Sequence, residues 1–372
     1  MAAPGWQGDP LRVLFRLIRP LFPAKPPRLS EWRSILVLKP CCIGDVLQST
    51  ALVAALRQAF PQARLGYAVG AWSRPVLANN PRLDVLVDTG SVVGGRPRDW
   101  RSHFSLVRTL RQGEWDACFL LERSPLFSLI AWLAGIRDRI GPDSGGRGLA
   151  LTVRVPVRPR RQEAEAYLDL ARAVGIETGE ATTEFYPSAA DQAQVDHLLG
   201  ERSHKSMIVL APGGGVNPGG ALVTKRWPPE CFGALAAMLA RYGHTIVVIG
   251  GPQDHQLAAQ VAEDSGGQAY DFCGRLTLPE CGALLQRASL FIGNDTGLMH
   301  LAAAVGAPVV ALFGPTDPAI YAPYTTKQRV IWHPQLCSPC FRQKSRRPEC
   351  QGECMRSITV AEVEAAALDL LS

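Results

Sequence analysis

The stretch GNDTGLMHLAAAVGAPVVALFGPTD, residues 293–317, places a strand end, a polar turn, a helix and a second strand in one short segment. The apolar run at 290–292 is typical of a strand, and the small residues at 298–305 favour a helix. A second apolar run then leads into the turn GPTD. The segment therefore predicts a strand–helix–strand unit.

The turn before this predicted helix is a candidate ligand site. Free N–H groups at a helix start, together with the helix dipole, favour a phosphate group. An anion at the turn that contains Asp295, Thr296 and Gly297 would meet free backbone N–H groups, and His300, one turn further on, would face the same pocket. Alternatively, Asp295 or Thr296 only caps the helix and His300 is a core histidine.

Strand and helix patterns alternate along most of the chain, which predicts a doubly wound α/β sheet. One alternation opens with a strand at 35–38, and a second opens with a strand at 207–210. The segment 141–161 predicts a long surface loop around a strand at 151–155, and the polar stretch 176–205 contains the predicted linker. The predicted organisation is an N-terminal extension 1–34, a first domain 35–190, a second domain 191–358 and a C-terminal helix 359–372.

Charge and cysteine content limit the kinds of partner. A net charge of +6 suits anionic substrates or an anionic membrane surface and falls short of a nucleic-acid footprint. Ten cysteines scattered through a large chain favour a reducing cytoplasm. The apolar stretch 298–313 is interrupted by His300, Gly306 and Pro308, so no membrane span is expected. Residues 11–20 form an amphipathic basic pattern that predicts a helix lying on an anionic inner leaflet or docked on its own domain.

The first loop that could take part in binding or catalysis is 39–45, which lies before a helix predicted from about residue 46 to 60. It lacks the G-x-G-x-x-G pattern, which argues against an NAD or FAD enzyme. Gly44 would form a tight turn, and Asp45 would stand at the helix start. Asp45 is then either a helix cap or a general base in a closed site.

Two further loops favour a nucleotide. In the loop 211–227, three consecutive glycines that include Gly214 and Gly215 offer backbone N–H groups, and Lys225 adds a positive charge, which together suit a diphosphate. In the turn after the strand at 245–249, Asp254 could accept ribose hydroxyl groups. Taken alone, these loops equally fit a flexible turn and a helix start.

Together these segments resemble glycosyltransferase family 9, the ADP-heptose:lipopolysaccharide heptosyltransferases. The resemblance runs from about Ile35 to the C-terminus and is carried by ILVLKPCCIGDVLQSTALVAALRQAFPQA, TKRWPPECFGALA, VVIGGP and FIGNDTGLMHLAAAVGAPVVALFGPTDP. It implies the GT-B fold, in which two Rossmann-like doubly wound domains face a central cleft. The first domain would bind the acceptor and the second the nucleotide sugar.

The resemblance also implies roles for single residues. Asp45 matches the catalytic base of the family, and Lys225 matches the residue that contacts the donor phosphates. Asp254 is a looser match to the ribose-binding acid. The implied diphosphate and sugar contacts are Asp295, Thr296, Gly297 and His300.

The implied reaction is the inverting transfer of a heptose from ADP-heptose to a lipopolysaccharide core or related anionic envelope glycolipid, in the cytoplasm and peripherally at the inner membrane. No D-x-D occurs in the chain, so no required metal cofactor is expected. Three alternatives stay open. They are a family member with a different nucleotide-sugar donor, a nucleotide-sugar epimerase of the same fold, and a non-catalytic sugar-binding or polysaccharide-assembly protein.

A separate cluster of cysteines lies near the C-terminus. Its spacing is C-x₂-C followed by C-x₃-C, at Cys337, Cys340, Cys350 and Cys354. By pattern alone, a structural zinc site, disulfides and free thiols are all open.

Overall fold

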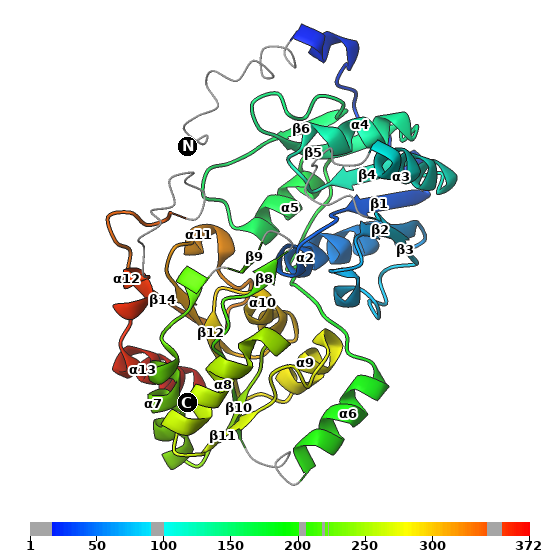
Figure 1. Cartoon of the computed structure of the whole chain (residues 1–372). Helices are drawn as coiled ribbons and strands as arrows, with labels where there is room; N and C mark the ends of the chain where they lie inside the picture. Colours follow the sequence, from blue (N-terminus) through cyan, green and yellow to red (C-terminus); the bar gives the residue numbers. More distant parts are fainter. Residues whose placement is uncertain (1–16, 91–99, 201–205, 218–219, 222, 341–351) are drawn as a thin grey trace. The chain divides into compact units, whose positions relative to one another are not determined.

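The computed structural model describes residues 17–90, 100–200, 206–217, 220–221, 223–340 and 352–372 (Figure 1). The chain divides into two compact units, one ending at Thr182 and the other beginning at Thr183. Most of the predicted helix at 11–20 lies outside the described residues, and its end forms the short 3₁₀ helix η1 (Arg19–Leu21). The domain limits predicted from the sequence stay predictions.

Unit 1 is built on one six-stranded sheet in the order β3-β2-β1-β4-β5-β6. Every neighbouring pair is parallel. The central strand β1, SILVL, is buried along its whole length, as expected for a strand covered on both faces. The strands are β1 (Ser34–Leu38), β2 (Arg64–Val69), β3 (Val85–Asp88), β4 (Ala117–Leu120), β5 (Asp138–Asp143) and β6 (Val153–Pro156).

Helices cover both faces of this sheet (Figure 1). On one face, α2 (Ile43–Ala59) packs against α5 (Glu163–Arg172). On the other, α3 (Trp100–Gln112) and α4 (Pro125–Leu133) enclose a core with side chains of β1 and β4. The short 3₁₀ helices η2 (Leu29–Glu31) and η3 (Arg74–Val76) lie in loops.

Unit 2 repeats the same plan. Its six-stranded sheet has the order β11-β10-β7-β12-β13-β14, and all its neighbouring pairs are parallel. A short antiparallel pair, β8 (Val216–Asn217) and β9 (Gly220–Ala221), lies in the loop after β7. The six main strands are β7 (Met207–Ala211), β10 (Thr245–Val248), β11 (Ala269–Asp271), β12 (Leu290–Asn294), β13 (Val309–Phe313) and β14 (Gln328–Trp332).

The main core of unit 2 lies between the sheet and three helices, α7 (Pro229–Arg241), α8 (His255–Asp264) and α13 (Val360–Leu371). The helix α10 (Gly297–Ala304) packs against β12, β13 and α9 (Leu278–Leu285), and α9 also contacts α6 (Ala189–Leu199). The remaining short helices are η5 (Val223–Lys225), η6 (Pro252–Asp254), α11 (Pro318–Tyr321) and α12 (Glu353–Arg356).

The prediction of two doubly wound sheets is confirmed, whereas three strands of these two sheets were missed. The predicted loop at 141–161 is wrong at its start, because β5 extends through Asp143 and pairs with both β4 and β6. Its sequence DRIGPD contains charged residues, Gly and Pro, a composition typical of a turn. The other two strands are edge strands, where β11 is short and β14 carries polar and exposed residues.

Each sheet has one point at which the chain order reverses. In unit 1 it lies between β1 and β4, and in unit 2 between β7 and β12. The loops that follow two such strands leave in opposite directions, and ligands of open α/β sheets bind there, beyond the carboxyl ends of the strands. The two sheets therefore single out the loops after β1 and β4, and those after β7 and β12.

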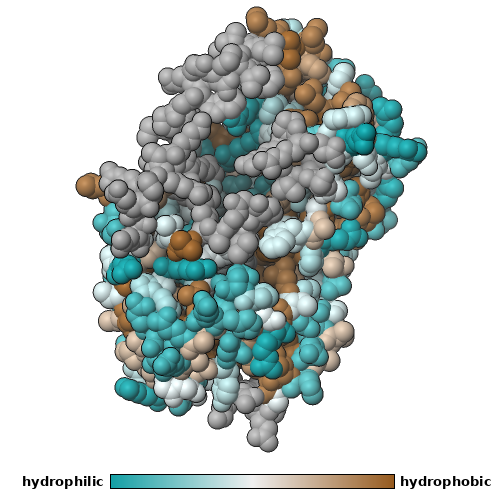
Figure 2. All heavy atoms as spheres, in the orientation of Figure 1, coloured by the Kyte–Doolittle hydropathy of each residue, from teal (hydrophilic) through white to brown (hydrophobic). Residues whose placement is uncertain are grey.

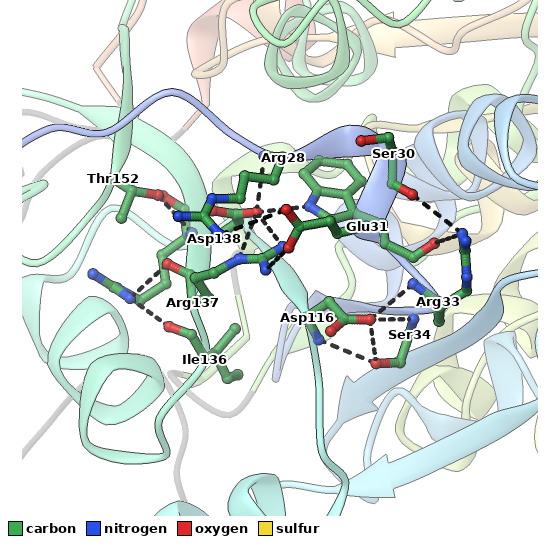
Figure 3. Close-up of polar contacts among 12 residues, drawn as sticks. Arg28, Ser30, Glu31, Arg33, Ser34, Asp116, Ile136, Arg137, Asp138 and Thr152 are labelled. Carbon is green, nitrogen blue, oxygen red and sulfur yellow. Dashed lines mark hydrogen bonds and ion pairs between the residues drawn. The ribbon is translucent and has the colours of Figure 1, made fainter.

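The opposite end of the first sheet is held by two buried or partly buried carboxylates (Figure 3). Asp138 Oδ2 accepts hydrogen bonds from the indole Nε1 of Trp32 at 2.7 Å and from the backbone N of Arg28 at 3.2 Å. Asp116 Oδ2 accepts from the backbone N of Arg33 and of Ser34 at 2.8 and 2.9 Å. Burial alone would raise the pKa of Asp116, but these N–H donors lower it overall. The contacts fix the segment that leads into β1.

Apolar surface is present where the described chain begins. Figure 2 shows it at the segment that carries Leu17 and Leu21, both of which are exposed. Phe22 packs its ring against that of Trp132 of α4, with 5.1 Å between the ring centroids. In the part of the chain that the structure describes, no helix has the length and apolar character needed to cross a membrane.

We predict that Trp32→Phe lowers the free energy of unfolding of unit 1 by about 1.5–3 kcal/mol. A phenylalanine ring can keep the packing against Phe60 and Phe119, but it leaves the buried Asp138 carboxylate without its indole donor. Urea unfolding followed by circular dichroism measures the change. The control Trp72→Phe, at a half-exposed tryptophan, should stay within about 0.5 kcal/mol of wild type. Equal effects of the two substitutions would contradict the role given to the Trp32–Asp138 bond.

Candidate functional site

The loop after β1 leads directly into α2. Cys42 has an extended backbone conformation and is the N-cap of the helix, and its carbonyl accepts from the N–H of Val46 at 2.9 Å. The helix therefore begins at Ile43, earlier than predicted. Gly44 lies in its first turn and not in a tight turn before it, which corrects the sequence-based expectation. Asp45 follows in the same first turn, at the end where helix N–H groups favour a carboxylate.

Lys39 is the cation beside Asp45, and sequence reasoning gave it no role. Its Nζ lies 3.0 Å from Asp45 Oδ2 and 2.9 Å from Oε1 of Glu122, which follows β4. The side chain of Lys39 is 8% exposed, whereas that of Asp45 is 32% exposed. Burial lowers the pKa of the Lys39 ammonium, but the negative charge of Asp45 and of the other acidic groups nearby raises it well above its usual value.

A further acidic group faces this ion pair from α5. Glu163 is buried, accepts a hydrogen bond from the hydroxyl of Tyr167 at 2.9 Å, and lies 3.8 Å from a guanidinium nitrogen of Arg123. A small cavity beside it is lined by residues of α5 and by the loops after β4 and β6. Arg158 and Arg161 also line this cavity, but both pair with Asp169. The loops after β1 and β4 thus form a charged site in which Asp45 is the more accessible carboxylate.

The corresponding loops of unit 2 bring Lys225 to Asp295. The Nζ of Lys225 lies 2.8 Å from Asp295 Oδ2 and donates to the backbone oxygen of Asp295 at 3.1 Å. Here the lysine side chain is 12% exposed and that of the aspartate is 6% exposed. Two residues that the sequence singled out separately, one before α7 and one after β12, therefore meet at the point where the chain order of the sheet reverses.

Asn294, the last residue of β12, holds these loops together and was not among the predicted site residues. Its Nδ2 donates to the carbonyl oxygens of Pro212 and Gly213, each at 3.0 Å, and its Oδ1 accepts from the N–H of Trp227 at 3.0 Å. The side chain is fully buried. A polar residue at the end of a buried strand was the signal that could have identified it.

The start of α10 lies next to the glycine-rich loop. Thr296 is the N-cap of α10 but makes no side-chain capping bond, and its Oγ1 is buried without a hydrogen-bond partner among the described residues. Gly215 has a φ of +73°, and a Cβ there would lie 3.4 Å from Thr296 Cγ2. The loop at Gly214 and Gly215 therefore borders the N-terminus of α10, where unpaired helix N–H groups suit an anion.

The last two predicted side chains of unit 2 are buried. Asp254 accepts from the N–H of Gly251 at 3.0 Å and lies 3.7 Å from a guanidinium nitrogen of Arg226. A Cβ on Gly213 would lie only 2.7 Å from its Oδ2, so the carboxylate packs directly against the glycine-rich loop. His300 lies in α10, one turn after Thr296. Their predicted contacts with a ribose and with a sugar diphosphate stay predictions.

The cysteine cluster is only partly described. Cys337 is exposed, Cys340 is partly buried and Cys354 is buried. Cys350 lies outside the described residues. Among the residues that the structure describes, no group of three or more His, Cys, Asp or Glu could hold a metal ion. The zinc prediction, which needs Cys350, stays a prediction.

Comparisons with known proteins agree with this architecture. The family model of glycosyltransferase family 9 (heptosyltransferase) matches residues 103–350. Lipopolysaccharide heptosyltransferase 2 of Escherichia coli strain K12 is 29% identical over 317 residues, which cover 80% of this chain and 87% of that protein.

Two solved structures share the fold. A glycosyl transferase of family 9 from Veillonella parvula has a TM-score of 0.77 and 24% identity, covering 91% of this chain and 97% of that one. The ADP-heptose lps heptosyltransferase II of E. coli has a TM-score of 0.71 and 24% identity, covering 91% and 98%. The expected GT-B class, with two Rossmann-like units, is confirmed.

We predict that Asn294→Ala lowers the free energy of unfolding of unit 2 by about 2–4 kcal/mol. The substitution leaves one buried N–H and two buried carbonyl groups without their amide partner. Urea unfolding measures the loss. The control is Asn80→Ala, which removes a buried amide of unit 1 that accepts a hydrogen bond from the N–H of Arg82. We expect this control to lower the free energy of unfolding by about 1 kcal/mol. A smaller effect at Asn294 than at Asn80 would contradict this assignment.

Proposed function

The chain belongs to glycosyltransferase family 9 and is a glycosyltransferase, and from this premise we propose that it transfers a heptose from ADP-heptose to a lipopolysaccharide core or a related envelope glycolipid. The proposed donor and acceptor follow the names of the relatives with which it shares sequence and fold. The proposed stereochemical outcome is inversion at the anomeric carbon.

The observation that carries the proposal is the site at the reversal point of the second sheet. Lys225 lies against Asp295, directly before the N-terminus of α10, and the Gly214–Gly215 backbone borders the same helix start. A diphosphate placed there would meet a lysine ammonium and helix N–H groups, which both favour negative charge. We propose that this site binds the donor diphosphate, with Gly297 and His300 beside it and Asp254 near the ribose.

In unit 1, we propose that Asp45 is the general base. Its carboxylate is partly exposed at the helix start that follows the central strand β1, so it can reach a bound hydroxyl. Gly44, next to it in the same helical turn, leaves room for the acceptor because it has no side chain. The acceptor belongs to unit 1 in this assignment, as the family resemblance implies.

The proposed reaction moves one proton and breaks one bond. The acceptor oxygen attacks the anomeric carbon of the sugar while the bond from that carbon to the diphosphate oxygen breaks on the opposite face. Asp45 takes the proton of the attacking hydroxyl. Lys225 and the N–H groups at the start of α10 stabilise the negative charge that grows on the leaving diphosphate. Because the chain lacks a D-x-D sequence, we propose that these groups act without a required metal ion.

We also propose that the reaction takes place in the cytoplasm at the inner membrane surface. The exposed Leu17 and Leu21 lie at the end of the amphipathic basic pattern of residues 11–20 and support contact with a membrane surface, whereas Arg19 pairs with Asp143 at 3.0 Å. A family member with another nucleotide sugar is the second candidate, because the contacts among the described residues do not distinguish one nucleotide base or sugar from another. A non-catalytic sugar-binding or polysaccharide-assembly protein would not need a base such as Asp45.

The test of the donor is equilibrium binding of ADP, UDP, GDP and dTDP, each with and without a chelator. We expect selective ADP binding that the chelator leaves unchanged, followed by heptose transfer from ADP-heptose to a deacylated core acceptor. Preference for another nucleotide would replace the donor. Absence of binding to every nucleotide would favour the non-catalytic alternative.

We predict that Lys225→Ala weakens ADP binding about 10-fold to 100-fold. The substitution removes one charge-assisted contact with the diphosphate, worth about 1.5–3 kcal/mol. Isothermal titration calorimetry measures the affinity. The control Lys327→Ala, at an exposed lysine of unit 2, should bind ADP like wild type. An unchanged affinity in Lys225→Ala would remove Lys225 from the donor site.

We predict that Asp45→Asn lowers the transfer rate about 100-fold to 10,000-fold and leaves ADP affinity within about twofold of wild type. The amide has nearly the same shape but cannot take the acceptor proton. Single-turnover transfer and ADP titration separate the two effects. The control Asp88→Asn changes an exposed carboxylate at the end of β3 and should leave both unaffected. Loss of rate and affinity by the same factor in Asp45→Asn would contradict its role as a base.

A further inference from the structure

The proposed reaction uses Asp45 and gives no role to the two charged residues that are linked to it. Lys39 is buried after β1, and its backbone N donates to the carbonyl oxygen of Ala68 at 3.1 Å. The backbone from which the Lys39 side chain extends is therefore held in place at the end of the central strand. Glu122 follows β4, and its partner among the described residues is this ammonium, at 2.9 Å.

We propose that Lys39 and Glu122 are positioning residues for Asp45, with Lys39 holding one oxygen of the Asp45 carboxylate and Glu122 sharing the positive charge of Lys39. The inference rests on the proposed function, in which Asp45 receives the acceptor proton. It adds that residues which do not touch the substrate set the balance of charge around Asp45.

The geometry supports the holding role. Asp45 stands in the first turn of α2, and Lys39 contacts its Oδ2 from the preceding loop at 3.0 Å. Because the Asp45 side chain is about one-third exposed while Lys39 is buried, the ammonium binds the carboxylate from the protein side. The rest of the carboxylate is left for an acceptor hydroxyl. A base held in this way keeps one orientation before the substrate arrives.

The surrounding charges explain why a second acid is needed. With Lys39 alone, the full positive charge of the ammonium would act on the Asp45 carboxylate. Glu122 shares the same ammonium, and Glu163, paired with Arg123, adds further negative charge. The groups that face Asp45 come from the loop after β1, from β2, from the loop after β4 and from α5. Lys39, the thiols of Cys41 and Cys42, Tyr67 and Tyr167 interact electrostatically with Asp45, and Glu122 and Glu163 act on Lys39.

This arrangement predicts opposite effects of two substitutions. In Lys39→Met the cation is lost among carboxylates, so Asp45 retains a proton to higher pH. In Glu122→Gln one anion is lost, so Lys39 acts more strongly on Asp45, which releases its proton at lower pH. In the double variant the lost positive and negative charges compensate. A purely structural role would lower activity in both single variants without moving the pH dependence in opposite directions.

The experiment is the pH dependence of kcat/KM for sugar transfer, measured on the full chain. We expect the midpoint of the acidic side of this pH profile to rise by about one pH unit or more in Lys39→Met and to fall in Glu122→Gln. In Lys39→Met/Glu122→Gln it should return towards wild type. Lys39→Arg keeps the positive charge, so the midpoint should stay near that of wild type. The control Lys25→Met removes an exposed lysine of the same unit and should not move it.

A second readout does not depend on turnover. The ¹³Cγ signal of Asp45, identified by its loss in Asp45→Asn, reports the ionisation of the carboxylate directly in each variant. We expect the same opposite displacements of its titration midpoint, and circular dichroism shows whether each variant is folded. A variant that does not fold is replaced by Lys39→Gln or by Glu122→Met, in which the same displacements are expected.

The outcomes separate this inference from the proposed function. A wild-type chain that transfers no sugar contradicts the proposed function, while the Asp45 titration still tests the charge balance. Active wild type with an unmoved midpoint in Lys39→Met overturns the inference and leaves the proposed function in place. Midpoints that move in the same direction in Lys39→Met and Glu122→Gln also overturn it.

Discussion

The burial of each central strand on both faces is the constraint on which the rest of the structure depends. The strands β1 and β7 pair in parallel with neighbours on both sides and are buried along their whole length. Strands covered on both faces carry mostly apolar side chains within the sheet. Polar function is therefore confined to the strand ends, and the reversal of chain order beside β1 and β7 selects which ends can hold a ligand.

The two units place a lysine–aspartate pair at this position but differ in which partner is accessible. In unit 1, Lys39 is the more buried member and Asp45 the more exposed, whereas in unit 2 Asp295 is the more buried and Lys225 the more exposed. The buried partner fixes the accessible one and offsets its charge while no ligand is bound. One arrangement therefore presents a carboxylate suited to a proton and the other presents an ammonium suited to a phosphate.

The sequence was sufficient for the fold class, and local signals also marked most residues of the candidate site. Apolar strands followed by helix starts predicted both sheets, and strand-end loops marked Asp45, Lys225 and Asp295. The missed elements had no such signal. The strand β5 has the composition of a turn and is recognised only through its pairing with β4 and β6. Glu122 and Asn294 have their contacts with residues more than sixty positions away in the chain, which periodicity does not report.

The ion pair between Lys225 and Asp295 affects how a donor site of this kind can bind its substrate and release its product. A diphosphate at the start of α10 would gain from Lys225 and the helix N–H groups, but it would also come close to the Asp295 carboxylate. Like charges oppose each other strongly where solvent is partly excluded. Under the proposed function, the carboxylate would keep the lysine oriented before binding and would limit the net attraction afterwards. Under the proposed function, the same residue that prepares the site for the donor also promotes release of the nucleotide product, whose diphosphate carries more charge after the sugar has left.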